Sequence, residues 1–195
     1  MKRRCATVER NTRETRIQAT LNLDGSGRCS IRTGMGFMDH MLDLLGHHAL
    51  WDLSLRARGD LNVDDHHTTE DIGLVLGEAL DEALGERRGI ARYGWALLPM
   101  DETLAEAAVD LGGRPFLVYA TPHKRRIKSF DVGLIEDFFR ALVTKGRLNL
   151  HVALRYGRDP HHGFEAMFKA VARALRMAAA PDPRESGIPS SKGRL

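Results

Sequence analysis

The chain of 195 residues contains little of several residue types on which particular protein classes depend. Its two cysteines, Cys5 and Cys29, are too few for a disulfide scaffold and lie outside any spacing typical of a thiolate metal site. Aromatic residues make up 6% of the sequence and do not alternate with basic ones, which argues against nucleic-acid binding. No apolar run approaches the ~18 residues of a membrane-spanning helix. The basic N-terminus lacks the apolar stretch of a secretory signal, so we expect a cytoplasmic protein.

The remaining composition is that of a folded domain. With 43% hydrophobic and 28% charged residues, the chain can bury a core and differs from a disordered protein. A net charge of +3 permits an anionic ligand without requiring a polyanion. Histidine is the conspicuous residue type, with nine copies, several of them near acidic residues.

One histidine motif occurs twice. The segment from His66 to Glu70 reads HHTTE, and the segment from His161 to Glu165 reads HHGFE. Each is followed by an Ala/Leu-rich helical pattern and preceded by an alternating strand with a polar loop, at 53–65 and 148–160. Two predicted helices, 37–50 and 131–146, lie upstream of these strands. The same order of elements in both places predicts an internal duplication.

We therefore predict an α+β fold of two similar half-domains, each a mixed sheet packed with two helices, within one domain. The first half spans 1–90, the second spans 91–180, and 181–195 form a C-terminal tail with the composition of a flexible end. Each half is expected to contain a hairpin. One covers 16–33 with its turn at DGSG, and the other covers 103–120 with its turn at LGGR.

The duplicated motif predicts metal binding. Adjacent side chains on a helix diverge by ~100°, whereas residues three or four apart share a face. Glu70 can therefore join either His66 or His67 on one metal, while the other histidine points elsewhere. Imidazoles with carboxylates suit Zn, Mn, Fe or Ni. Because each of the two copies has two diverging histidines, we expect two metals, whose ligands are shared between halves or subunits. Asp64 and Asp65 could cap the helix and orient the imidazoles. A single His pair would usually be a solvated cap, but the duplication favours metal.

A third ligand for each site has several candidates. His40 lies on the helix ahead of His66. The corresponding place in the second half holds Asp137, and His151 on the preceding strand competes with it. The isolated histidines are expected to have surface or packing roles: His47, His48 and His123.

Several further segments stand out in order along the chain: GFMDHML at 36–42, GD at 59–60, DDHHTTED at 64–71, PMDE at 99–102, DLGGRP at 110–115, HHGFE at 161–165 and PSSKG at 189–193. Together, over nearly the whole chain, these segments resemble the imidazoleglycerol-phosphate dehydratase family. The resemblance implies a hydro-lyase of histidine biosynthesis that converts imidazole glycerol phosphate to imidazole acetol phosphate and water. It also implies two Mn²⁺ ions per active site. The implied assembly is a hollow homo-oligomer of twenty-four subunits, built from trimers, with metal sites at subunit contacts.

The resemblance also implies roles for individual residues. Residues that match its metal-ligand motifs are His40, His66, His67, Glu70, His161, His162 and Glu165. Residues that match its substrate contacts are Glu14, His48, Arg92, Arg114, Lys169, Ser190, Ser191 and Lys192, together with the ligands His40, His66, Glu70 and His161. Many members carry a histidine just before the Phe-Phe pair of the predicted helix 131–146, where this chain has Asp137. Asp137 could supply an oxygen ligand instead, or another group could fill that position.

The implied reaction explains why these residues would be needed. The proton to be lost lies beside a hydroxyl and is too weakly acidic for a side-chain base alone. A deprotonated imidazole ring, stabilised through its nitrogens by two metals, could expel the adjacent hydroxyl. A general base must then remove the C–H proton. Glu14 is the first candidate, with Glu70 or Glu165 as alternatives. Arg92, Arg114 and the tail would hold the phosphate.

Two other functions remain open from the residues alone. Paired histidines could cross-link subunits as structural metal sites without catalysis. Metal-bound hydroxide could instead serve a hydrolase. A structural site, however, has no use for Arg92, Arg114 and the PSSKG tail. The basic run KRRIK at 124–128 is expected to be a solvated loop.

Overall fold

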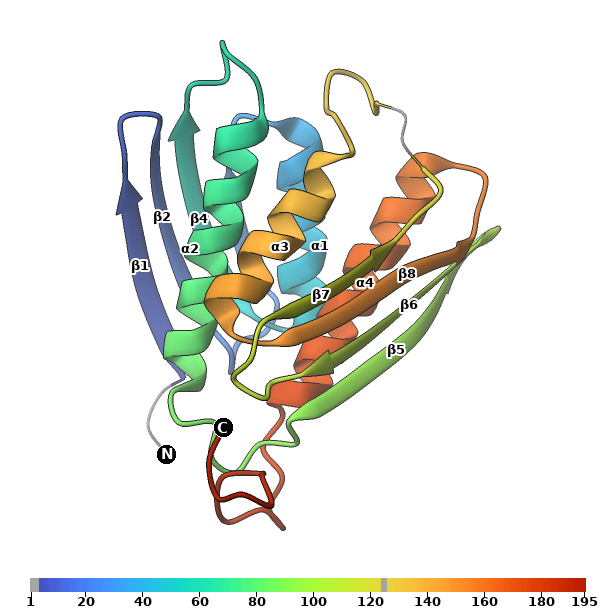
Figure 1. Cartoon of the computed structure of the whole chain (residues 1–195). Coiled ribbons are helices and arrows are strands. Elements are labelled where there is room, and N and C mark those ends of the chain that lie inside the picture. The colour runs from blue at the N-terminus through green and yellow to red at the C-terminus, as the bar shows by residue number, and fades with distance from the viewer. Residues whose placement is uncertain (1–3, 124–125) are drawn as a thin grey trace.

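The computed structural model describes residues 4–123 and 126–195. Two four-stranded sheets enclose a layer of helices (Figure 1). The first sheet has the order β1 (Cys5–Asn11), β2 (Thr15–Asn22), β4 (Asp52–Gly59), β3 (Cys29–Arg32). The second has the order β5 (Tyr93–Met100), β6 (Thr103–Asp110), β8 (Asn149–Tyr156), β7 (Phe116–Ala120). Each sheet is mixed, with β3 parallel to β4 and β7 parallel to β8. The predicted α+β fold of two similar halves is confirmed.

The helices pack mainly across the two halves. They are α1 (Gly36–Ala49), α2 (His66–Leu84), α3 (Leu134–Gly146) and α4 (Pro160–Ala179). The principal helix partner of α1 is α4, and that of α2 is α3. Gly73 and Gly77 of α2 allow this close approach, because a Cβ on either would lie 2.5 Å from a carbonyl oxygen of α3. The halves therefore share one core, in which Trp51, Phe138 and Phe164 are buried.

The two predicted hairpins are wrong. β2 and β3 do not pair with each other, since β4 lies between them, and β8 likewise separates β6 from β7. The DGSG segment is not a tight turn between paired strands. Instead, the carboxylate of Asp52 accepts hydrogen bonds from the backbone N–H groups of Ser26 and Arg28. These bonds hold the segment against the start of β4. The true hairpins are β1–β2 and β5–β6.

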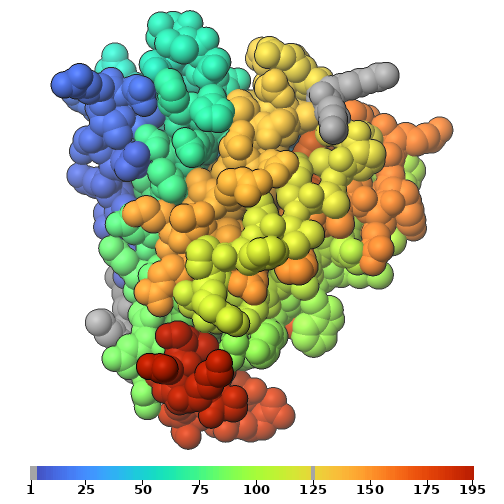
Figure 2. All heavy atoms as spheres, viewed as in Figure 1, coloured from blue at the N-terminus to red at the C-terminus, as the bar shows by residue number. Residues whose placement is uncertain are grey.

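The tail folds back onto the connection between the halves. Gly89 N–H donates to the carbonyl of Gly187 at 2.9 Å, and Ile90 forms a β-bridge with Pro181. Figures 1 and 2 show the tail at the end of the molecule opposite the starts of α2 and α4. Composition predicted a flexible end, but these residues form turns held by backbone hydrogen bonds. None of the described helices has the length and apolar character needed to cross a membrane.

Candidate metal centre

The structure brings together three metal-ligand candidates from the two halves. His40 lies on α1, whereas His161 and Glu165 lie one turn apart on α4. The Nε2 atoms of His40 and His161 lie 3.2 Å and 3.4 Å from Oε2 of Glu165. One ligand atom from each residue falls within 4.8 Å of the others, and no further group of this kind occurs in 4–123 and 126–195. Two imidazoles and a carboxylate at this separation fit a divalent transition metal.

Glu165 is held as a carboxylate in this cluster. Burial raises the pKa of Glu165, but hydrogen bonds from Lys169 and His40 outweigh it and leave the pKa below its usual range. Lys169 Nζ lies 2.6 Å from Oε1 of Glu165, so Oε2 faces the imidazoles. Burial, followed by the charge of Lys169, lowers the pKa of nearby His48. His48 therefore favours the neutral form that can share hydrogen bonds with a substrate.

A second, looser group lies between α2 and α3, at the place that the duplication makes equivalent to the first. Asp137 in the first turn of α3 lies with its Oδ2 3.8 Å from Nδ1 of His66 on α2. Glu70 is exposed one turn further along α2. His151 lies exposed on the outer face of β8, beside Phe116, whereas the helices cover the inner face. The structure thus places Asp137, and not His151, near His66.

The second histidine of each pair contacts a carboxylate. Nδ1 of His67 lies 3.0 Å from Oδ2 of Asp60 and 4.0 Å from Oε2 of Glu14. Nδ1 of His162 lies 3.0 Å from Oε2 of Glu102. These hydrogen bonds raise the pKa of both histidines, and the His162 contact lowers the pKa of Glu102 to about 2. With Nδ1 engaged, Nε2 is the nitrogen left for a metal.

The sequence did not reveal which acids orient these imidazoles. Asp64 instead accepts a hydrogen bond of 2.8 Å from the backbone N–H of His66. The side chain of Asp65 makes no capping hydrogen bond to the helix. The repeat could have revealed Glu102, because a Glu-Thr pair stands where the second strand of each half begins, at 14–15 and 102–103.

The phosphate-binding candidates gather at the other end of the molecule. Asp110 accepts two hydrogen bonds from Arg92, whose Nη1 donates to the carbonyl of Pro189 at 2.8 Å. Ser190 and Ser191 line a groove beside Arg92. Exposed Lys192 follows in the same tail, and Arg114 is exposed in the β6–β7 connection. Helix α4, with 20 residues, separates the two ends by ~30 Å. One protomer therefore does not bring its phosphate candidates to its histidines.

A cavity of about 360 Å³ opens beside the His40–His161–Glu165 cluster. His40, His161 and Phe37 line it, together with Lys128. Lys128 belongs to the basic run 124–128. Residues 124 and 125 lie outside the described part of the chain, whereas the following residues are exposed except for half-buried Ile127. The predicted solvated loop therefore also borders this cavity.

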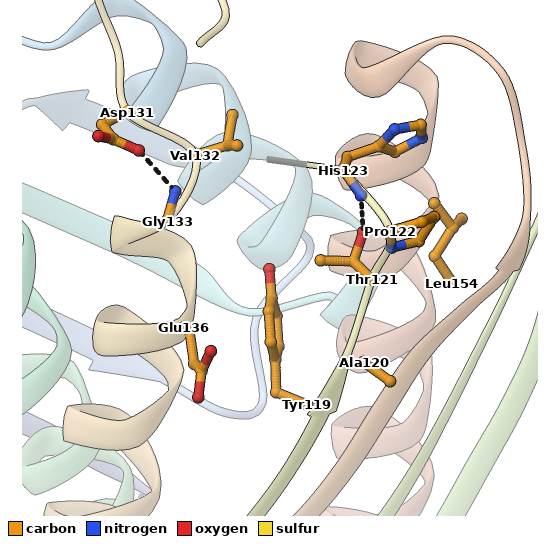
Figure 3. Close-up of a pocket in the computed structure, with 10 residues that line it drawn as sticks. All are labelled: Tyr119, Ala120, Thr121, Pro122, His123, Asp131, Val132, Gly133, Glu136 and Leu154. Atoms are coloured by element: carbon orange, nitrogen blue, oxygen red, sulfur yellow. Dashed lines mark hydrogen bonds between the residues drawn. The ribbon is translucent and has the colours of Figure 1, made fainter. Parts of the chain in front are cut away.

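A larger cavity of about 610 Å³ lies between β7 and α3 (Figure 3). Tyr119 of β7 and Glu136 of α3 line it near one another, and His123 lines it farther along the chain from Tyr119. The Tyr119 hydroxyl and His123 Nε2 are buried without a hydrogen-bond partner among the described residues. Burial, with a smaller effect of Glu136, raises the pKa of Tyr119. His123 packs against Phe164, a packing role as the sequence indicated.

Comparison with known proteins decides the family. Residues 33–175 match the family model described as imidazoleglycerol-phosphate dehydratase. The chain belongs to the imidazoleglycerol-phosphate dehydratase family. The protein of that name from Acidiphilium cryptum is 55% identical over 194 residues, which cover 98% of this chain and 99% of the relative. That from Cereibacter sphaeroides (strain KD131 / KCTC 12085) is 56% identical over 194 residues, 98% of this chain and 100% of the relative.

Solved dehydratase structures share the fold. The crystal structure of imidazoleglycerol-phosphate dehydratase from Staphylococcus aureus matches with a TM-score of 0.82 and 39% identity, over 91% of this chain and 99% of that one. The enzyme from Pyrococcus furiosus, in complex with (S)-C348, matches with a TM-score of 0.84 and 34% identity, over 96% and 100%. Family membership makes this dehydratase a lyase of histidine biosynthesis.

Proposed function

We propose that the chain eliminates water from imidazole glycerol phosphate to give imidazole acetol phosphate, with two Mn²⁺ ions per active site. The observation that carries this proposal is the cluster of His40, His161 and Glu165, built from both halves of a chain that belongs to the dehydratase family. The donor set is chemically suitable, because imidazole nitrogen and carboxylate oxygen both bind divalent manganese.

The two metal positions follow the duplication. One is held by His40, His161 and Glu165, and the other by His66, Glu70 and Asp137. We assign His67 and His162 to the same two kinds of site in neighbouring copies, because their Nδ1 atoms are engaged and they diverge from His66 and His161 on their helices. When bound, the metals supply Lewis-acid stabilisation of the negative charge that develops on the substrate's imidazole ring.

The proton transfers fall to carboxylates. Glu14 is the proposed general base for the C–H proton, and its 55% exposed side chain lies near His67 without a close hydrogen bond to it. Glu70 and Glu165 are alternatives that would be partly occupied by metal. Lys169 pairs with Glu165, and His48 lies within the influence of the Lys169 charge, so the two would contact the substrate from α4 and α1.

The phosphate is proposed to bind at the other end of a neighbouring copy. Arg92 and Arg114 offer forked donors, and the tail offers Ser190, Ser191 and Lys192. Because ~30 Å of helix separates this end from the histidines of the same protomer, a complete site requires two or more copies.

Self-assembly is therefore part of the proposed function. We propose the homo-oligomer of twenty-four subunits implied by the family resemblance. The outer face of the second sheet supports an assembly, because it exposes large apolar side chains: Tyr93, Trp95, Leu97, Phe116 and Val118. The outer face of the first sheet instead carries exposed polar residues: Arg16, Gln18, Arg56 and Arg58. We place the enzyme in the cytoplasm, in keeping with its biosynthetic role.

The decisive experiment measures turnover of imidazole glycerol phosphate by metal-stripped protein, with and without added Mn²⁺. We expect no turnover without metal and restored turnover with it, together with a rise in sedimentation coefficient. Absence of activity under both conditions would overturn the proposed reaction. Hydrolysis of the phosphate ester without dehydration would favour the metal-hydroxide alternative.

A further inference from the structure

Two glutamates occupy equivalent places in the duplicated halves. Glu14 ends the turn between β1 and β2, and Glu102 ends the turn between β5 and β6. Each directly precedes a buried threonine that begins the next strand, Thr15 or Thr103. Each also faces the second histidine of its own half. The two halves therefore place a glutamate at the same position relative to their second histidine.

The contacts of these glutamates differ. Oε2 of Glu102 lies 3.0 Å from Nδ1 of His162, while its Oε1 accepts the backbone N–H of Asp159 at 3.0 Å. Oε2 of Glu14 lies 4.0 Å from Nδ1 of His67. The side chain of Glu102 is 26% exposed and that of Glu14 is 55% exposed. Glu102 is therefore committed to two hydrogen bonds, whereas Glu14 is left towards solvent.

The connections before the two histidine helices explain this difference. In the first half, residues 60–65 join β4 to α2, and Oδ2 of Asp60 lies 3.0 Å from Nδ1 of His67. In the second half, residues 157–159 join β8 to α4. The acid of this shorter connection, Asp159, accepts the backbone N–H groups of His161 and His162. In that half Glu102, and not the acid of the connection, contacts the imidazole of His162.

We propose that Glu102 is a positioning residue that holds His162 with Nδ1 as donor and Nε2 directed to a metal. Asp60 does the same for His67, which frees Glu14 for the substrate. A carboxylate on the far nitrogen fixes the tautomer and ring orientation of a metal-binding histidine. The inference rests on the proposed function for the part played by Glu14, but the roles of Glu102 and Asp60 concern metal binding alone.

The division of roles predicts opposite behaviour for equivalent substitutions. Glu102→Ala should weaken Mn²⁺ binding about 10–100-fold, the range typical of lost outer partners of metal-binding histidines. Turnover should recover at saturating Mn²⁺, because Glu102 does not contact the reacting atoms. Glu14→Gln should keep the Mn²⁺ affinity of the parent protein and lose turnover even at saturating Mn²⁺. Asp60→Ala should behave like Glu102→Ala.

The experiment titrates Mn²⁺ into the metal-stripped full-length protein by calorimetry and follows turnover over the same concentrations. Asp101→Asn is the matched control, since it removes the neighbouring charge of the same turn and should leave Mn²⁺ affinity unchanged. Glu102→Gln serves if Glu102→Ala does not fold. An amide can present either oxygen or N–H to Nδ1 and so selects no single tautomer, which should weaken Mn²⁺ binding to an intermediate degree.

Two results would overturn the inference. One is parental Mn²⁺ affinity in both Glu102 variants. The other is a loss of affinity in Glu14→Gln as large as that in Glu102→Ala, which would make the two glutamates alike. Failure of the proposed function has a different signature, namely a parent protein that binds Mn²⁺ but does not turn over imidazole glycerol phosphate. The affinity ranking of Glu102→Ala against Asp101→Asn still tests the positioning role in that case.

Discussion

His40 and Glu165 lie 125 positions apart in the chain, and Nε2 of His40 lies 3.2 Å from Oε2 of Glu165. The contact exists because α1 of the first half packs against α4 of the second. Neither half could form this part of the candidate metal centre alone. The duplication therefore did more than repeat a motif, since it placed the ligands of one half beside those of the other.

Removal of His40 should weaken metal binding at this cluster. His40→Ala deletes one imidazole and leaves His161 and Glu165 without their partner from α1. We expect less bound Mn²⁺ per chain in equilibrium dialysis and a fall in turnover of at least tenfold. His47→Ala, an exposed histidine of the same helix, is the control and should retain the parental metal content.

Replacement of Asp137 tests the departure from the family pattern. Asp137→Ala should weaken Mn²⁺ binding, whereas Asp137→His should keep or strengthen it, because the substitution restores the imidazole that many family members carry there. Glu136→Gln changes the neighbouring acid, which pairs with Arg140 instead of His66. Equal Mn²⁺ affinities for all three variants in calorimetry would show that Asp137 is not a ligand.

Mixing two inactive variants should restore activity. Glu14→Gln damages the histidine end of the molecule, and Lys192→Ala damages the phosphate end. If each active site combines opposite ends of different copies, chelator-dissociated variants that are mixed and reassembled with Mn²⁺ will contain some intact sites. We expect mixed assemblies to exceed the sum of the two separate activities in a turnover assay. No gain over that sum would place both residues in a site within one protomer.

Arg87 is expected to be essential for stability. Its 2% exposed guanidinium contacts Asp81 and donates to the carbonyls of Gly146 and Arg147 at 2.8 Å and 2.9 Å, tying the connection between the halves to the end of α3. Arg87→Met should lower the free energy of unfolding by about 3–5 kcal/mol, because the buried partners lose their donor. Urea denaturation of the metal-free protein measures this loss. The exposed neighbour Arg88→Met should change stability by at most about 0.5 kcal/mol.

Asp52 should contribute to the acid sensitivity of the fold. A hydrogen bond from Arg28, followed by the backbone N–H groups of Ser26 and Arg28, lowers the pKa of Asp52. A lowered folded-state pKa adds stability above the unfolded pKa of about 4, which is lost as the pH falls through the folded value. Asp52→Asn should therefore be less stable at pH 7 and lose less stability between pH 4 and 2. Unfolding measured across this range tests the effect, with exposed Asp43→Asn as the charge control.

Sequence patterns predicted the four helices and most of the strands, but not β1 or β5. The helical periodicity and the repeated His-His-x-x-Glu motif predicted α2 and α4, together with two similar halves, because such local preferences need no knowledge of distant contacts. Strand order was not predictable in this way. Turn residues at DGSG suggested a hairpin of β2 and β3, but β4, which follows α1 in the chain, pairs with β2 instead.

By itself the sequence determined which side chains are candidates for the metal centre: histidines and carboxylates placed on helical faces by their spacing. The tertiary structure decided which of them meet. Packing of α1 on α4 joins His40 to Glu165, and the hairpin turn carrying Glu102 reaches Nδ1 of His162. Only the structure reveals that the histidines lie a helix length away from Arg92 and the tail. The physical reason is that side-chain spacing along a chain specifies a face, whereas contact between faces depends on how the helices and sheets pack together.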